Sequence, residues 1–384
     1  MVQLLLVIIY LSFISLGLPD ALLGAAWPTM QASFGVPLSY AGIVSMIIAA
    51  GTILSSLCSD RISARLSTGK ITLISVATTA VALYGFSASD AFWKICLWAV
   101  PYGLGAGSVD AALNNYVALH YESRHMSWLH CMWGVGATTG PYLMGLALTG
   151  GRSWNMGYLY IAVIQSVLTV ILLISLPLWK KGTSEAEKRR DALPLRQVVR
   201  FPGAKAVMLC FFCYCGVEQT AGLWLGSYLT LQRGFSPQTA AGLSGMFFMG
   251  IAAGRALSGF LTLRLSDRAM IRLGMALIAV GIGLVLWPGK EICLIGFILI
   301  GLGCAPVYPC IIHSTPAHFG AERTPAIIGI QMASAYVGTL SMPPLFGQLA
   351  GRIGTAWLPA FLALLLVVMI VMYERLNQQT EGNR

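Results

Sequence analysis

Long apolar stretches separated by short polar connections run along the whole chain. A helix that spans a bilayer needs about 20 predominantly apolar residues. By that measure the pattern predicts spans near residues 3–29, 39–58, 71–88, 92–119, 128–150, 157–179, 204–231, 239–262, 270–288, 292–316, 325–351 and 356–374. The first stretch lacks a basic leading segment and continues through Pro19 and Asp20 to Met30, so we interpret it as a membrane helix and not as a cleaved signal peptide. The prediction is therefore twelve membrane helices.

Composition agrees with a membrane protein. Of 384 residues, 57% are hydrophobic and 10% are charged, and the mean hydropathy of +0.76 lies outside the range of soluble globular proteins. The cysteines lie in or at the ends of the apolar stretches, so we expect no disulfide framework. Cys210, Cys213 and Cys215 are close in sequence, but helical spacing turns Cys215 away from the other two. We expect neither a metal site nor a cofactor.

The distribution of lysine and arginine predicts the orientation in the membrane. If both termini lie on one side, nearly all the basic residues fall in connections on that side, and the other side holds only Lys94, Arg152, Arg233, Lys290 and Arg352. Short basic loops stay in the cytoplasm. We therefore expect a multi-pass protein of the cell inner (plasma) membrane with both termini cytoplasmic. This distribution also accounts for the net charge of +10 without a nucleic-acid partner.

A polar segment divides the chain into two similar parts. The predicted organisation is a six-helix half over 1–179, a cytoplasmic linker over 180–203 and a second six-helix half over 204–384. A shift of roughly 200 residues aligns the halves. For example, Gly51, Gly103 and Pro141 fall on Gly254, Gly301 and Pro343, in the same helix order. Six helices per half make the repeat parallel. We predict an all-α membrane protein with the major facilitator architecture.

Away from their ends, the predicted spans contain four charged residues. They are Asp20 in helix 1, Asp110 in helix 4, Glu218 in helix 7 and Arg255 in helix 8. Charges inside a bilayer are costly and are expected at functional sites or in compensating pairs. Helices 3, 6, 9 and 12 carry none, so we expect helices 1, 4, 7 and 10 to line a cavity and the chargeless helices to face lipid. Arg255 is expected to pair with one of the acids, in a structural or gating role.

Polar and aromatic residues accompany the acids. Asp110 and Asn114 are spaced i, i+4 on one helix face, and Gln219 adjoins Glu218. Carboxylates, amides and aromatic rings together suit a sugar, whose hydroxyls need hydrogen bonds and whose C–H faces pack on rings. The alternative is that some of these side chains only bridge helices. The candidate substrate-binding residues are Asp110, Asn114, Asn115, Glu218, Gln219, His130, Trp133, Trp224, Tyr308 and Gln331.

Several of these residues form a pattern with a known counterpart. The pattern is Asp110-x-x-x-Asn114, then Leu129-His130-x-x-Trp133-Gly134-x-Gly136-x-x-x-Gly140-Pro141, then Gly216-x-Glu218 with Gly222-x-Trp224 and Tyr228, and Pro306-x-Tyr308-Pro309. Over nearly the whole chain it resembles the fucose–proton symporter family, which includes sodium-dependent glucose carriers. The resemblance implies a sugar–cation symporter with one acid in helix 1 and another in helix 4, one for coupling and one for sugar binding. By position Asp20 and Asp110 would take these roles.

Two further resemblances concern gating and direction. The loop with Asp60 and Arg61 loosely resembles the gating loop of the superfamily, which implies a structural or gating role without individual assignments. The segment Gly136-x-x-x-Gly140-Pro141 also resembles the helix 5 signature of drug–proton antiporters. Small residues and a proline in a membrane helix serve close packing whatever the direction of transport.

The expected function is secondary active uptake of a monosaccharide or similar polar solute, coupled to a cation, with a proton favoured over sodium. The alternative is a proton-coupled exporter of drugs or metabolites. An enzyme that uses Asp110, His130 and Glu218 as acid and base is not expected, because these residues lack the spacing of a nucleophile or metal site. We expect a monomer surrounded by lipid, with no nucleic-acid partner.

Overall fold

A computed structural model describes residues 2–58, 62, 65–121, 123–179, 195–320 and 322–380. All regular secondary structure in these residues is helical. The first part of the chain forms α1 (Val2–Asp20), α2 (Leu22–Phe34), α3 (Tyr40–Leu57), α5 (Thr68–Ser87), α6 (Phe92–His120), α7 (Ser123–Thr149) and α8 (Trp154–Ser175). The second forms α9 (Leu195–Val198), α10 (Ala204–Arg233), α11 (Pro237–Leu243), α12 (Gly245–Leu261), α13 (Asp267–Leu286), α14 (Lys290–Phe319), α15 (Thr324–Ile353) and α16 (Leu358–Thr380).

These helices make twelve passes, as predicted. Within the described residues, 9 helical segments have both the length and the apolar composition to cross a membrane, and one of them joins α1 with α2 and another α11 with α12. The other three passes are α6, α7 and α15, whose 29, 27 and 30 residues also give enough length at about 1.5 Å per residue. The all-α membrane architecture is confirmed. Most of the predicted linker lies outside the described residues, so the boundaries 1–179, 180–203 and 204–384 stay a prediction.

The first pass is broken in its middle. Helix α1 ends at Asp20, α2 begins at Leu22, and Ala21 between them forms a turn. Pro19 contributes to the break because it has no backbone N–H to donate and its ring disturbs the preceding turn. Asp20 therefore lies at a helix end deep in the protein.

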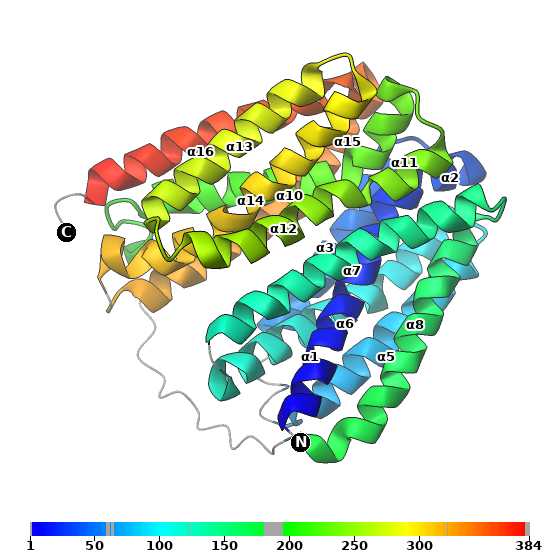
Figure 1. Cartoon of the computed structure of the whole chain (residues 1–384), viewed down its shortest axis with the longest axis horizontal. Helices are drawn as coiled ribbons and strands as arrows, with labels where there is room; N and C mark the ends of the chain where they lie inside the picture. Colours follow the sequence, from blue (N-terminus) through cyan, green and yellow to red (C-terminus); the bar gives the residue numbers. More distant parts are fainter. Residues whose placement is uncertain are drawn as a thin grey trace.

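The two halves have their chain ends at one face of the molecule (Figure 1). We call the face at which α1 begins and α16 ends the terminal face, and the opposite face, with the turns at 35–39, 150–153 and 234–236, the distal face. Helices α5, α8, α13 and α16 pack mainly within their own half. They expose apolar side chains to the surroundings, such as Val81, Val167, Val280 and Val367, each 55–57% exposed. Their charged residues lie only towards their ends at the terminal face, and their outer position matches the prediction.

Contacts between the halves are made by α2 with α10, by α3 with α15, and by α7 with α11 and α12. Near the distal face the backbones approach closely. A methyl group added at Gly24 of α2 would lie 2.7 Å from the carbonyl oxygens of Gly222 and Leu223 on α10. The halves meet in this region and diverge towards the terminal face (Figure 1).

Candidate functional site

A cavity of about 260 Å³ lies between the two halves. Nine of the twelve passes contribute to its lining, from α1 and α2, α3, α5, α6, α7, α8, α10, α12 and α15. Its polar side chains include Asp20, Glu218 and Gln219, and aromatic rings complete the wall: Phe86, Tyr102, Trp133, Tyr158, Phe248 and Tyr336. Acids, an amide and rings thus surround one space, which is the composition of a site for a small polar molecule.

Two donors from different helices hold the Asp20 carboxylate. The hydroxyl of Tyr102 on α6 donates to Oδ1 at 2.8 Å, and the indole Nε1 of Trp133 on α7 donates to Oδ2 at 2.8 Å. Asp20 remains exposed to the cavity because it ends α1 at the break in the first pass. A carboxylate with both oxygens bonded and one side open to solvent has a fixed position and still has access to ions.

Helix α10 contributes the second acid and the amide. Glu218 is largely buried, and it accepts a hydrogen bond from the hydroxyl of Tyr214, one turn earlier on the same helix. Gln219 is exposed and lines the cavity. The neighbouring residues therefore differ: Glu218 is held by its own helix, whereas the amide of Gln219 faces the space that a solute would fill.

Arg255 of α12 contacts a ring and a carbonyl group. Its guanidinium lies 5.0 Å from the ring centroid of Trp133, and its Nη1 donates to the carbonyl of His130 at 3.3 Å. In the described part of the chain no carboxylate lies within ion-pair distance of it. The expected direct pair with an acid is therefore not formed in this structure. Asp110 interacts electrostatically with Arg255, but only at longer range than an ion pair.

Asp110 and Asn114 lie on α6, closer to the terminal face than the cavity. The amide of Asn114 donates to both the backbone carbonyl and Oδ1 of Asp110, each at 3.0 Å. Asp110 is eight residues beyond Tyr102, or about 12 Å along the helix, and it is not among the residues that line the cavity. The side chain of Asn115 and the residues Asp60 and Arg61 lie outside the described part of the structure.

The other predicted residues connect helices inside one half. The ring of His130 packs edge-on against Phe13, and Tyr308 donates to the sulfur of Met332 at 3.1 Å. Trp224, which is fully buried, donates to the carbonyl of Pro343 at 2.9 Å, and Gln331 bonds with Thr315. No residue of α14 is among the lining residues, so the tenth pass does not line the cavity as expected. Helix bridging, the alternative interpretation, describes these residues in this structure.

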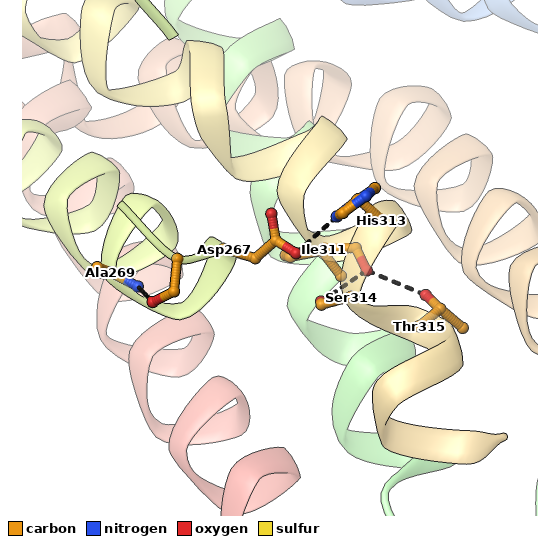
Figure 2. A network of polar contacts seen from close by, with 7 residues as sticks. Asp267, Ala269, Ile311, His313, Ser314 and Thr315 are labelled. Carbon is orange, nitrogen blue, oxygen red and sulfur yellow. Dashed lines mark hydrogen bonds and ion pairs between the residues drawn. The ribbon is translucent and has the colours of Figure 1, made fainter. Parts of the chain in front are cut away.

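A separate polar contact lies at the terminal end of the second half. Figure 2 shows His313 of α14 and Asp267 at the start of α13 directed towards one another, with 2.7 Å between Nδ1 and Oδ2. Ser266 caps α13 by accepting from the backbone N–H of Ala269. This contact joins two neighbouring helices of one half and takes no part in the cavity.

Sequence reasoning missed Tyr102, Tyr158, Phe248 and Tyr336. One signal was available for Tyr102, which shares a helix face with Asp110 at spacing i, i+8. Phe248 had a similar signal, because it lies seven residues before Arg255 on one face of α12. Tyr158 and Tyr336 have no charged residue beside them in their helices, and only packing directs them into the cavity.

The glycine motif of α7 packs against α1 within the first half. A methyl group at Gly136 would lie 2.0 Å from the carbonyl oxygen of Ile14, and one at Gly140 would lie 1.9 Å from that of Leu18. The motif therefore allows two backbones to touch, which is the role that small residues play in any membrane helix pair.

Twelve passes in two halves around a central polar cavity define a multi-pass secondary transporter. The family model of the Major Facilitator Superfamily matches residues 9–289 and 207–383. The chain belongs to this superfamily, and its substrate is a small molecule.

Curated relatives are similar at low identity. Bypass of stop codon protein 6 of Saccharomyces cerevisiae is 20% identical over 97% of this chain and 81% of its own length. Sodium-dependent glucose transporter 1 of Homo sapiens is 24% identical over 89% of this chain and 72% of its own length. The glucose/mannose transporter GlcP of Bacillus subtilis is 28% identical over 60% of this chain and 59% of its own length.

A solved structure has the same fold. The nucleoside transporter NupG superposes with a TM-score of 0.75 at 14% identity and covers 97% of this chain and 98% of its own. At this identity the similarity defines the fold alone.

Proposed function

We propose that the chain takes up a monosaccharide or similar polar solute in symport with a cation, with a proton as the favoured ion. The observation that carries the proposal is the cavity, in which Asp20, Gln219 and aromatic rings face one space between the halves. A volume of about 260 Å³ lies just below the range of about 300–1,000 Å³ for small-molecule sites, which suits a solute the size of a single sugar.

Solute binding is assigned to the residues that line the cavity. Gln219 offers both a donor and an acceptor to hydroxyl groups, while Tyr158 and Phe248 offer ring faces to C–H groups. Two of the relatives described above are sugar transporters by name, which supports the same solute class.

Coupling is assigned to Asp20, with Asp110 as a second acid on the route to the terminal face. Asp20 is open to the cavity, and its position at a helix break lets its surroundings change when the halves move. Protonation would remove the charge and weaken both hydrogen bonds that hold it. Asp110 lies on the same helix as Tyr102 and within electrostatic reach of Asp20 and Arg255.

The orientation follows from charge. The described basic connections, with Arg65, Arg264 and Arg323, lie at the terminal face, so we place this face in the cytoplasm and the protein in the cell inner (plasma) membrane. With the halves in close contact near the distal face, the arrangement is that of an inward-facing transporter. The cavity would exchange solute with the cytoplasm in this state and with the outside after the halves rock about it.

Uptake into proteoliposomes tests the proposal. Labelled hexoses would be supplied with an imposed proton gradient, with an imposed sodium gradient and with neither. We expect saturable, concentrating uptake of a sugar with the proton gradient. Efflux of lipophilic compounds without any sugar uptake would instead establish the exporter alternative, and concentration driven by sodium alone would replace the proton as the ion.

A further inference from the structure

We propose that Trp133 is a positioning residue that transmits the charge state of Asp20 in one half of the protein to Arg255 in the other half. This inference rests on the proposed function, because it takes Asp20 as the group that binds the coupling proton.

The indole ring of Trp133 fills part of the interface between α7 and α12. It packs edge-to-face on Phe248, with 6.1 Å between ring centroids, and it lies under the guanidinium of Arg255 at 5.0 Å. Phe248 and Arg255 are seven residues apart, which places them two turns apart on one face of α12. One side chain of the first half therefore contacts two residues of the second. The nearby bond from Arg255 to the carbonyl of His130 joins the same pair of helices.

The other end of the same indole holds the acid. Its Nε1–H donates to Oδ2 of Asp20 at 2.8 Å. While Asp20 is ionised this is a charge-assisted bond, roughly twice as strong as a neutral one, and it fixes the plane of the ring beneath Arg255. A proton on Asp20 weakens the bond, the ring is then free to tilt, and the cation–π contact with Arg255 weakens because it depends on the ring face.

Arg255 is sensitive to this change because its direct contacts are few. In the described residues they are the Trp133 ring and the His130 carbonyl, with no carboxylate at ion-pair distance. Weakening one of them loosens α12 against α7, the helix pair that must separate or close when the halves rock.

Tyr102 provides a matched comparison. It donates to the other oxygen of Asp20 at the same distance of 2.8 Å, but its ring packs on Phe86 within the first half. Both residues hold the acid, and of the two only Trp133 reaches α12. The titratable and charged groups that face Asp20 across the cavity or along its helices are Tyr102 and Asp110 on α6, Tyr158 on α8, Glu218 on α10 and Tyr336 on α15.

Hydrogen–deuterium exchange of α12 in the full-length protein in nanodiscs tests the proposal. Rates are corrected for the intrinsic pH dependence of exchange and compared at low and high pH. In the wild type we expect amides around Arg255 to exchange about five- to tenfold faster at low pH, the ratio that corresponds to a change from a charge-assisted to a neutral hydrogen bond. Trp133→Phe keeps an aromatic face and removes the N–H, so it should abolish this difference, whereas Tyr102→Phe should retain it.

The outcomes separate the inference from the proposed function. If Trp133→Phe retains the pH difference, if Tyr102→Phe abolishes it equally, or if the wild type has none, the role of Trp133 is refuted. If Asp20→Asn still concentrates solute, the assignment of coupling to Asp20 is what fails, and if the wild type takes up no sugar with either gradient, the proposed function fails. Should Trp133→Phe not fold, Arg255→Gln removes the cation from the same contact and must also abolish the difference.

Discussion

Replacement of Asp20 by asparagine tests the coupling role through a change the structure can accommodate. Asparagine has one acceptor and one donor where the carboxylate has two acceptors. The indole of Trp133 can only donate, so it would take the amide oxygen, while the hydroxyl of Tyr102 can accept from the amide nitrogen. Both hydrogen bonds persist in neutral form, and we expect a loss of about 1–3 kcal/mol, partly offset by the lower cost of burying a neutral group. The variant should fold.

The Asp20→Asn variant should still move solute across the membrane, but a proton gradient should no longer drive its accumulation. One proton moving down about 100 mV supplies about 2.3 kcal/mol, which corresponds to about fiftyfold accumulation of solute at 1.4 kcal/mol per factor of ten. Because asparagine does not titrate, we expect solute binding and exchange across the membrane to continue while the accumulation ratio falls to about one.

The assay is uptake and counterflow of labelled solute in proteoliposomes, with Asp90→Asn as the matched control. Asp90 lies in the connection between α5 and α6, exposed and 2.6 Å from Lys94. The hydrogen bond and charge of Lys94 hold the pKa of Asp90 below its usual value, so Asp90 is ionised at neutral pH and Asp90→Asn removes a negative charge outside the cavity. The control should accumulate solute normally. If Asp20→Asn concentrates solute at the wild-type ratio, Asp20 is not the coupling site and Asp110 or Glu218 becomes the candidate.

Three further substitutions probe binding, closure and packing. Gln219→Ala should weaken solute binding by about 1–3 kcal/mol, because an amide facing the cavity is lost; calorimetry that gives wild-type affinity would remove Gln219 from the site. Gly24→Val should hinder close contact with Gly222. It should therefore destabilise, by about 1–3 kcal/mol, the conformation in which the two halves touch near the distal face. Unchanged distances between spin labels across the distal face would contradict this. Trp224→Phe leaves the Pro343 carbonyl without its donor and should lower the unfolding free energy by about 1–3 kcal/mol at constant solute affinity; a fall in affinity measured on the folded variant would return Trp224 to the binding site.

The sequence by itself determined the class of fold. Apolar stretches of membrane length and basic residues concentrated in alternate connections follow from the physics of the bilayer, which acts on every residue locally. The repeat at roughly 200 residues is visible directly in the sequence. The same logic located the outer helices, because a charge in the middle of a span has a local cost. These features need no knowledge of which helices touch.

Tertiary structure decided which polar residues share one space. Asp110 and Asn114 match the composition of a sugar site as well as Gln219 does, yet they lie farther along α6 towards the terminal face and do not line the cavity. Trp224 is instead buried within one half, where its indole donates to the carbonyl of Pro343. Arg255 lies over a ring and not beside an acid, because the packing of α12 against α7 places Trp133 next to its guanidinium. Periodicity assigns a residue to a helix face, but the neighbour that covers that face is set by how twelve helices pack together.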